Sequence, residues 1–214
     1  MKMTEIPVYH NGNQQDSMRA YYRWHATVYD ATRWSFLFGR NALLHKIAAH
    51  KPETVLEVGC GTGSNLKRLA ALLPQAKFIG VDVSPHMLQR ATRATRRFSR
   101  RVLLFERAYK PDRHSWLQQP DVVFFSYALT MFNPGAEEAL DRALSDLPSG
   151  GLAAVVDFHD TPFAFFQWWM GKNHVRMEGH LMPMLEQRFV TREKLIVRAW
   201  FGLWRYIIYI GVKA

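Results

Sequence analysis

The chain has 214 residues, of which 48% are hydrophobic and 21% charged, so it can bury a core and is not expected to be disordered. Its single cysteine, Cys60, excludes an internal disulfide framework and a cysteine-based zinc site. The formal net charge of +10 favours an anionic partner, either nucleic acid or a membrane rich in acidic lipid.

Residues 1–17 are polar and contain no apolar segment typical of a secretory signal, so we expect a cytoplasmic protein. Residues 18–50 mix aromatic, basic and apolar positions and predict one or two helices. We therefore expect an N-terminal helical segment at residues 1–50, followed by one domain at residues 51–214. No apolar run approaches the roughly 20 residues needed to span a bilayer.

From residue 54 onward, short apolar runs bounded by turn signals alternate with stretches of helical length. This alternation predicts an α/β fold with a mostly parallel sheet covered on both faces. The two aromatic and β-branched runs Lys194–Phe201 and Trp204–Val212 predict a closing antiparallel hairpin. The five expected parallel strands are Thr54–Val58, Lys77–Val81, Val102–Phe105, Asp121–Ser126 and Leu152–Phe158.

A glycine-rich turn follows the first expected strand, with Glu57, Gly59, Gly61 and Gly63 at alternate positions. Glycines let the backbone turn sharply and let a ligand approach the main chain. The spacing differs from the Gly-x-Gly-x-x-Gly of dinucleotide enzymes, and no P-loop lysine is present. Asp82 ends the second expected strand, where its carboxylate is placed to accept hydrogen bonds from a ribose diol.

Together these residues resemble the S-adenosylmethionine site of class I methyltransferases, over residues 54 to about 158. The resemblance implies a Rossmann-like, seven-stranded fold in which the glycines shape the cofactor turn and Asp82 binds the ribose. Arg107 stands where that family often carries an adenine-binding carboxylate, so backbone groups or Glu106 are expected to recognise the adenine. The other implied cofactor contacts are Tyr29, Glu57, Val83, Met87, Arg107, Ala108 and Ser126. The alternative is a nicotinamide-binding Rossmann domain or a degenerate fold.

Two clusters outside this motif bear on the partner. Residues 163–169 hold five aromatic rings, which predicts either a thick buried helix or a tryptophan-rich surface at a membrane or around acyl chains. Residues 90–101 hold six arginines and no acid, which predicts either a solvated basic helix or contact with phosphate groups of lipid or RNA.

A narrower resemblance rests on the aromatic and basic stretch 21–40, on Val-Asp-Phe-His-Asp at residues 156–160 and on residues 173–180. These stretches look like the bacterial diacylglycerylhomoserine N-methyltransferases, which make the betaine lipid diacylglyceryl-N,N,N-trimethylhomoserine. The resemblance implies a lipid substrate, an anionic membrane surface as partner and peripheral attachment to the inner face of the membrane.

Three alternatives for the substrate stay open. Phosphatidylethanolamine N-methyltransferases share the aromatic lid. An RNA methyltransferase fits the charge, but the expected Asn/Asp-Pro-Pro-aromatic tetrad is replaced by Ser126-Tyr127-Ala128-Leu129, so nucleic acid is not expected as a partner. A small-molecule methyltransferase leaves residues 163–170 unexplained.

Methyl transfer to an amine needs a neutral lone pair held in line with the methyl–sulfur bond, so proximity and orientation supply most of the acceleration. Tyr127 and His159 are the expected proton acceptors, and His159 is alternatively a structural hydrogen-bond partner. Tyr29 is expected to close over the cofactor. The expected head-group contacts are Tyr22, Arg33, His174 and Arg176, with Arg33 or Arg176 holding the homoserine carboxylate. No histidine spacing indicates a metal site, so none is expected.

Overall fold

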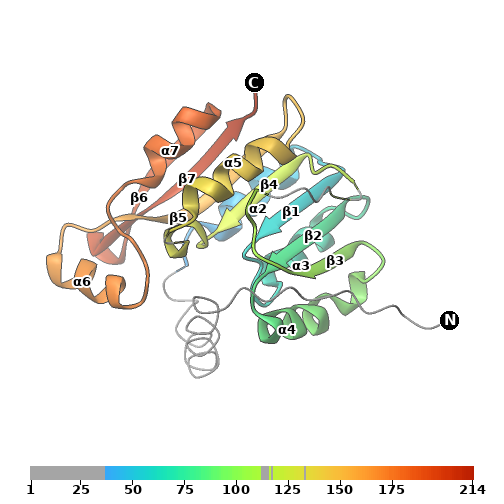
Figure 1. Ribbon diagram of the computed structural model, residues 1–214, viewed down its shortest axis with the longest axis horizontal. Coiled ribbons are helices and arrows are strands. Elements are labelled where there is room, and N and C mark those ends of the chain that lie inside the picture. Colours follow the sequence, from blue (N-terminus) through green and yellow to red (C-terminus); the bar gives the residue numbers. More distant parts are fainter. Residues whose placement is uncertain (1–36, 112–115, 117, 133) are drawn as a thin grey trace. The chain divides into compact units, whose positions relative to one another are not determined.

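A seven-stranded sheet in the order β3-β2-β1-β4-β5-β7-β6 organises the described residues, which are 37–111, 116, 118–132 and 134–214 (Figure 1). Strands β1 to β5 are parallel, and β7 is antiparallel to both β5 and β6. The strands are β1 (Thr54–Val58), β2 (Lys77–Asp82), β3 (Val102–Glu106), β4 (Val122–Ser126), β5 (Leu152–Asp160), β6 (Val190–Ala199) and β7 (Trp204–Val212). The predicted fold class is confirmed, although β6 begins four residues before the expected Lys194.

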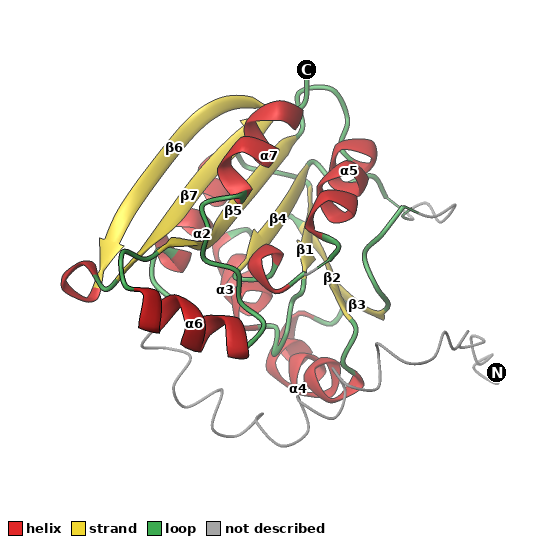
Figure 2. Cartoon of the chain, turned by 60° about the vertical axis from the view of Figure 1, so that its left-hand side comes forward, coloured by secondary structure: helices red, strands yellow, loops and turns green. Residues whose placement is uncertain are grey.

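Helices cover both faces of this sheet. One layer contains α2 (Arg40–Ala49), α3 (Ser64–Leu72) and α4 (Pro85–Thr95), which pack along one another. The other layer contains α5 (Ala136–Asp146) and α7 (Leu181–Arg188), while α6 (Ala164–Lys172) lies beside the turn between β6 and β7 (Figure 2). The short 3-10 helices are η1 (Arg96–Phe98), η2 (Leu129–Met131) and η3 (Trp200–Gly202).

The central strands read as continuous hydrophobic runs because both of their faces are covered. Every residue of β1 and of β4 is buried. Val55 of β1 lies opposite Phe78 of β2 on one side and opposite Val122 of β4 on the other. Because parallel strands end at the same edge, the turns after β1, β2, β4 and β5 gather there, which is where ligands of α/β sheets bind.

The expected N-terminal segment, residues 1–50, falls mostly outside the described residues, and its role as a lid stays a prediction. Its last part, α2, belongs to the compact unit of residues 37–214. The buried side chains of Leu43, Leu44 and Ile47 hold α2 in that unit.

The arginines of residues 90–101 have different surroundings in the structure. The guanidinium of Arg101 donates to the carbonyl oxygens of Ala70, Leu73 and Ala76 at 2.8–2.9 Å. These carbonyls include ones that a helix end leaves without an intrahelical donor, so Arg101 caps α3. The exposed members of the run are Arg93, Arg96, Arg97 and Arg100.

Candidate functional site

The turn after β1 is built from backbone. Gly59, Gly61 and Gly63 have φ angles of 70°, 52° and 71°, a left-handed conformation that favours glycine. A Cβ atom added to Gly59 would lie 2.9 Å from Cβ of Ala128, and one added to Gly63 would lie 2.9 Å from Cβ of Ala91. A side chain at either position would force neighbouring atoms to move, so both positions require glycine. The compact turn leads directly into the N-terminus of α3, where a ligand can approach the backbone.

The carboxylate of Asp82 stands beside this turn at the end of β2. One oxygen accepts a hydrogen bond from the backbone N–H of Gly61 at 2.8 Å, and the other accepts from that of Ser84 at 2.9 Å. Each carboxylate oxygen can accept a further hydrogen bond. A half-buried carboxylate fixed in this way fits the ribose diol of S-adenosylmethionine.

Glu57 links β1 to the helix that follows the turn. Its buried carboxylate accepts a hydrogen bond from the side-chain amide of Asn65 in α3 at 2.7 Å. The acid of the sequence motif therefore braces the turn from inside the core.

The remaining described cofactor candidates differ in their surroundings. Val83 is exposed, whereas Met87 is buried in α4 and donates its N–H to the Ser84 hydroxyl at 3.4 Å. Ser126 is buried at the end of β4, and Ala108 is half-buried.

The backbone of Arg107 lies next to that of Asp82. Its N–H donates to the carbonyl oxygen of Asp82 at 3.0 Å, as expected for a residue that follows β3. Its guanidinium lies 5.0 Å from the ring centroid of Trp116. This cation–π contact holds the Arg107 side chain against Trp116. Glu106, the residue before Arg107, lies opposite Asp82 in the register of β3 with β2.

Tyr127 follows β4 in a left-handed conformation, with φ 55°. Its buried hydroxyl donates to the carbonyl oxygen of Phe38 at 2.8 Å, and its ring meets that of Phe158 edge-on at 4.7 Å. Burial, with a further contribution from nearby Asp157, raises the pKa of Tyr127 well above its usual value. These properties suit a hydrogen-bond donor better than a proton acceptor.

Asp157 belongs to the stretch 156–160, but the sequence predicted no role for it. It is fully buried in β5 and accepts hydrogen bonds from the N–H groups of Leu129 and Phe158, both at 2.8 Å, and from the hydroxyl of Thr130. Burial raises its pKa to about 6, although these hydrogen bonds act in the opposite direction. Asp157 thereby fixes the loop after β4, and the available signal was an acid inside an otherwise apolar strand.

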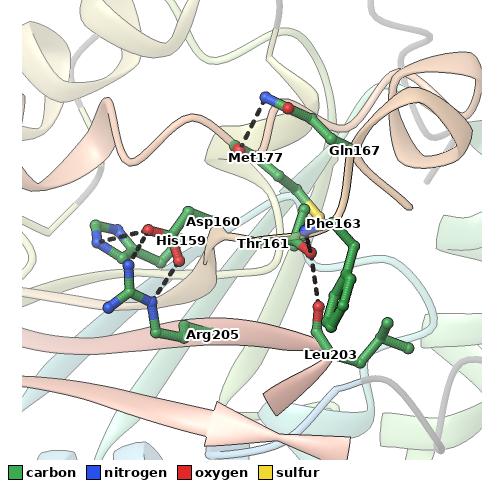
Figure 3. A network of polar contacts seen from close by, with 8 residues as sticks. All are labelled: His159, Asp160, Thr161, Phe163, Gln167, Met177, Leu203 and Arg205. Carbon is green, nitrogen blue, oxygen red and sulfur yellow. Dashed lines mark hydrogen bonds and ion pairs between the residues drawn. The ribbon is translucent and has the colours of Figure 1, made fainter. Parts of the chain in front are cut away.

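His159 lies in different surroundings from Tyr127. Its carbonyl oxygen accepts from the N–H of Gly179 at 2.8 Å, and its Nε2 lies 3.9 Å from the Asp160 carboxylate, which is paired with Arg205 (Figure 3). Burial lowers the pKa of His159, and Asp160 opposes that effect. The lowered pKa favours the neutral imidazole, which is the form that can accept a proton.

The segment after α6 brings the backbone of Arg176 to η2, the short helix that follows β4. Its N–H donates to the carbonyl oxygen of Thr130 at 3.1 Å, and its guanidinium pairs with Glu178 at 2.8 Å. His174, with φ 60°, donates its N–H to the carbonyl oxygen of Gly171 and helps to end α6. The other expected contacts, Tyr22, Tyr29 and Arg33, lie outside the described residues.

Within the described part of the chain, no group of three or more His, Cys, Asp or Glu side chains could hold a metal ion. No helix there is both long and apolar enough to cross a membrane.

Residues 56–153 match a family model described as a methyltransferase domain. This stretch contains the glycine turn, Asp82 and the strands that position them. A methyltransferase domain therefore covers residues 56–153, just under half of the chain. S-adenosylmethionine is its cofactor, in agreement with the earlier resemblance.

The methyltransferase domain has curated relatives over about half of the chain. Trans-aconitate 2-methyltransferase of Pseudomonas paraeruginosa is 35% identical over 112 residues, which are 52% of this chain and 38% of that enzyme. Malonyl-[acyl-carrier protein] O-methyltransferase of Anoxybacillus flavithermus is 43% identical over 51 residues, which are 24% of this chain and 19% of that enzyme. The chain spans less than half the length of these relatives.

Solved structures share the fold of the methyltransferase domain at low identity. N-methyltransferase NodS of Bradyrhizobium japonicum WM9, in complex with S-adenosyl-L-homocysteine, gives a TM-score of 0.66 at 18% identity and covers 82% of this chain and 86% of its own. The [4+2]-cyclase SpnF gives a TM-score of 0.74 at 14% identity and covers 94% and 97%. At these identities the likeness extends to the fold alone.

Proposed function

We propose that this methyltransferase domain methylates the amine of a membrane lipid, and that the acceptor is diacylglycerylhomoserine, which becomes diacylglyceryl-N,N,N-trimethylhomoserine. The observation that carries the proposal is the position and character of α6. This helix begins four residues after β5 ends, and its Phe165, Trp168 and Trp169 are exposed. An apolar helix beside the ligand-binding edge of the sheet suits an acceptor that carries acyl chains.

S-adenosylmethionine supplies an electrophilic methyl group on a sulfonium. The chain's own task is to hold the acceptor amine in line and to remove its proton. The Asp157 carboxylate fixes the loop that contains Leu129 and Thr130, and so fixes the end of β4. His159, whose lowered pKa favours the neutral imidazole, is the proposed proton acceptor. Tyr127, whose hydroxyl donates to the carbonyl oxygen of Phe38, is the proposed positioning residue after β4.

Two arginines, Arg33 and Arg176, were expected to hold the homoserine carboxylate, and of these Arg176 lies within the described residues. Its partner Glu178 lies on the surface, and the two side chains are 40% and 51% exposed. An exposed ion pair contributes only about 0–1 kcal/mol. Exchange of Glu178 for a substrate carboxylate therefore costs little, and an arginine fork binds a carboxylate through two parallel hydrogen bonds.

A second candidate is transfer to the carboxylate of a small organic acid. The 35% identity to trans-aconitate 2-methyltransferase over 112 residues favours it. Arg176 would serve there too, because such an acceptor also presents carboxylates. The exposed rings of α6 would then have no role in catalysis.

Methyl transfer from labelled S-adenosylmethionine tests both candidates, with diacylglycerylhomoserine, phosphatidylethanolamine and trans-aconitate as separate acceptors and product masses as the readout. We expect transfer to diacylglycerylhomoserine, and a loss of about 10- to 100-fold in Arg176→Gln. Arg188→Gln is the matched control, because Arg188 also pairs with one carboxylate, Asp141 at 2.6 Å, but lies on α7. Faster transfer to phosphatidylethanolamine or to trans-aconitate would contradict the proposed substrate.

A further inference from the structure

Six large aromatic side chains from two separate parts of the chain are exposed where α6 meets the turn between β6 and β7. We call this surface the aromatic tip; its residues are Phe163, Phe165, Trp168, Trp169, Trp200 and Phe201. Phe165 and Trp168 are 67% and 66% exposed, and Phe201 is fully exposed. Large rings presented together to solvent indicate an interaction surface.

The two parts of the aromatic tip are held together from beneath. Phe166, on the buried side of α6, stacks on Trp204 of β7 with ring centroids 5.5 Å apart and an interplanar angle of 13°. The hydroxyl of Thr161 donates to the carbonyl oxygen of Leu203 at 2.6 Å (Figure 3). Because Phe166 already fills the inner side, the outer rings of α6 cannot turn inward to be buried.

The turn itself projects its rings outward. Trp200 and Phe201 have φ angles of 46° and 55°, which bulky side chains rarely adopt, and Gly202 follows at 93°. Asparagine or glycine would fit these two positions with less strain. The sequence instead places a tryptophan and a phenylalanine at these two positions of the hairpin turn.

Basic side chains stand beside the aromatic tip. The ammonium of Lys172 lies 5.6 Å from the ring centroid of Trp168, and exposed Arg198 lies opposite Arg205 in the hairpin register. Residues 163–172 contain no acid. The nearby carboxylate of Asp160 is paired with Arg205. The aromatic tip therefore carries positive charge at its margin.

We propose that the aromatic tip inserts into the interfacial layer of a bilayer that contains anionic lipid. Tryptophan and phenylalanine rings at the level of the head groups, flanked by lysine and arginine that reach lipid phosphates, are the combination that such an interface favours. The turn and α6 both lie at the sheet edge where β5 ends, so insertion brings the bilayer surface to the cofactor edge. The inference deepens the proposed function by naming the partner of that site.

Vesicle co-sedimentation of the full chain tests the proposal without any methyl acceptor. The vesicles consist of phosphatidylcholine with about one third phosphatidylglycerol, in about 0.1 M salt. We expect the wild type to bind, and Phe165→Ser/Trp168→Ser/Phe201→Ser to lower the vesicle partition constant by about tenfold or more. Tryptophan quenching by brominated acyl chains should fall in Trp168→Phe.

The matched control is Val190→Ser/Leu195→Ser/Ile196→Ser, which removes three exposed apolar side chains from β6. We expect this variant to bind vesicles as the wild type does, and circular dichroism checks that both triple variants fold. Equal loss in both variants, or unchanged binding in the tip variant, would overturn the proposal. A wild-type dimer that the tip variant abolishes, without vesicle binding, would assign the surface to a second copy of the chain.

The two proposals can fail separately. Vesicle binding with methyl transfer only to trans-aconitate would reject the lipid substrate and keep the aromatic tip as a bilayer contact. Transfer to diacylglycerylhomoserine in detergent without vesicle binding would keep the substrate and reject the tip.

Discussion

The carboxylate of Asp82 accepts a hydrogen bond from the backbone N–H of Gly61 at 2.8 Å, so the end of β2 holds the turn that follows β1. Its second oxygen accepts from Ser84, the N-cap residue of α4. One side chain thus positions both the cofactor turn and the start of the next helix, in addition to its expected contact with the ribose.

Asp82→Ala should weaken S-adenosylmethionine binding by about 1.5–3 kcal/mol, because hydrogen bonds to a charged group are lost. Isothermal titration calorimetry measures this affinity. Asp121→Ala is the matched control, since Asp121 also braces two backbone N–H groups, those of Glu53 and Thr54 at 2.7 and 2.8 Å, but at the start of β1. Equal affinity losses in the two variants would mean that Asp82 only supports the backbone and does not contact the ribose.

Gly63→Ala should destabilise the fold by about 2–4 kcal/mol, because the new methyl group must adopt a left-handed conformation and also meets Ala91. Gly150→Ala introduces the left-handed strain alone, as φ is 80° and no atom lies within 4 Å of the added Cβ. It should cost about 1–2 kcal/mol. Urea unfolding compares the two variants, and similar costs would show that the contact with Ala91 relaxes freely.

Asp157 should make stability depend on pH between about 4 and 6. Its folded pKa of about 6 lies above the ordinary value of 3.8, so the folded state retains a proton that the unfolded state releases. As the pH rises through this range, the free energy of unfolding should fall by about 2–3 kcal/mol relative to that of Asp157→Asn, which does not titrate. Urea unfolding at several pH values measures the difference, and a constant difference would mean that Asp157 ionises normally in the fold.

Arg101→Gln should lower the free energy of unfolding by about 1.5–3 kcal/mol, because three carbonyl groups, two at the end of α3 and one just before β2, lose a charged donor. Arg97→Gln, at an exposed position in the same run, should change stability by less than about 0.5 kcal/mol. Thermal denaturation of both variants provides the comparison. If the two variants lost similar stability, the capping role of Arg101 would be wrong.

Short-range sequence patterns determined the parallel strands, the closing hairpin and the cofactor turn. Hydrophobic patterning within each run predicts the strands, and glycine spacing predicts the turn after β1. The acid at the end of β2 meets that turn because the neighbouring strands β1 and β2 pair in parallel. The proposed position of Arg176 could not be derived from local patterns, because its backbone N–H meets the carbonyl oxygen of Thr130 from a segment more than forty residues away in the chain.

Tertiary structure alone decided which members of similar sequence runs serve which purpose. Arg101 differs from Arg97 because α3 ends beside it, and Phe166 is buried while Phe165 is exposed because Trp204 lies under one side of α6. The same packing joins the Trp200–Phe201 turn to α6 across more than thirty residues of sequence. These contacts form between elements remote in the chain, so no local periodicity encodes them.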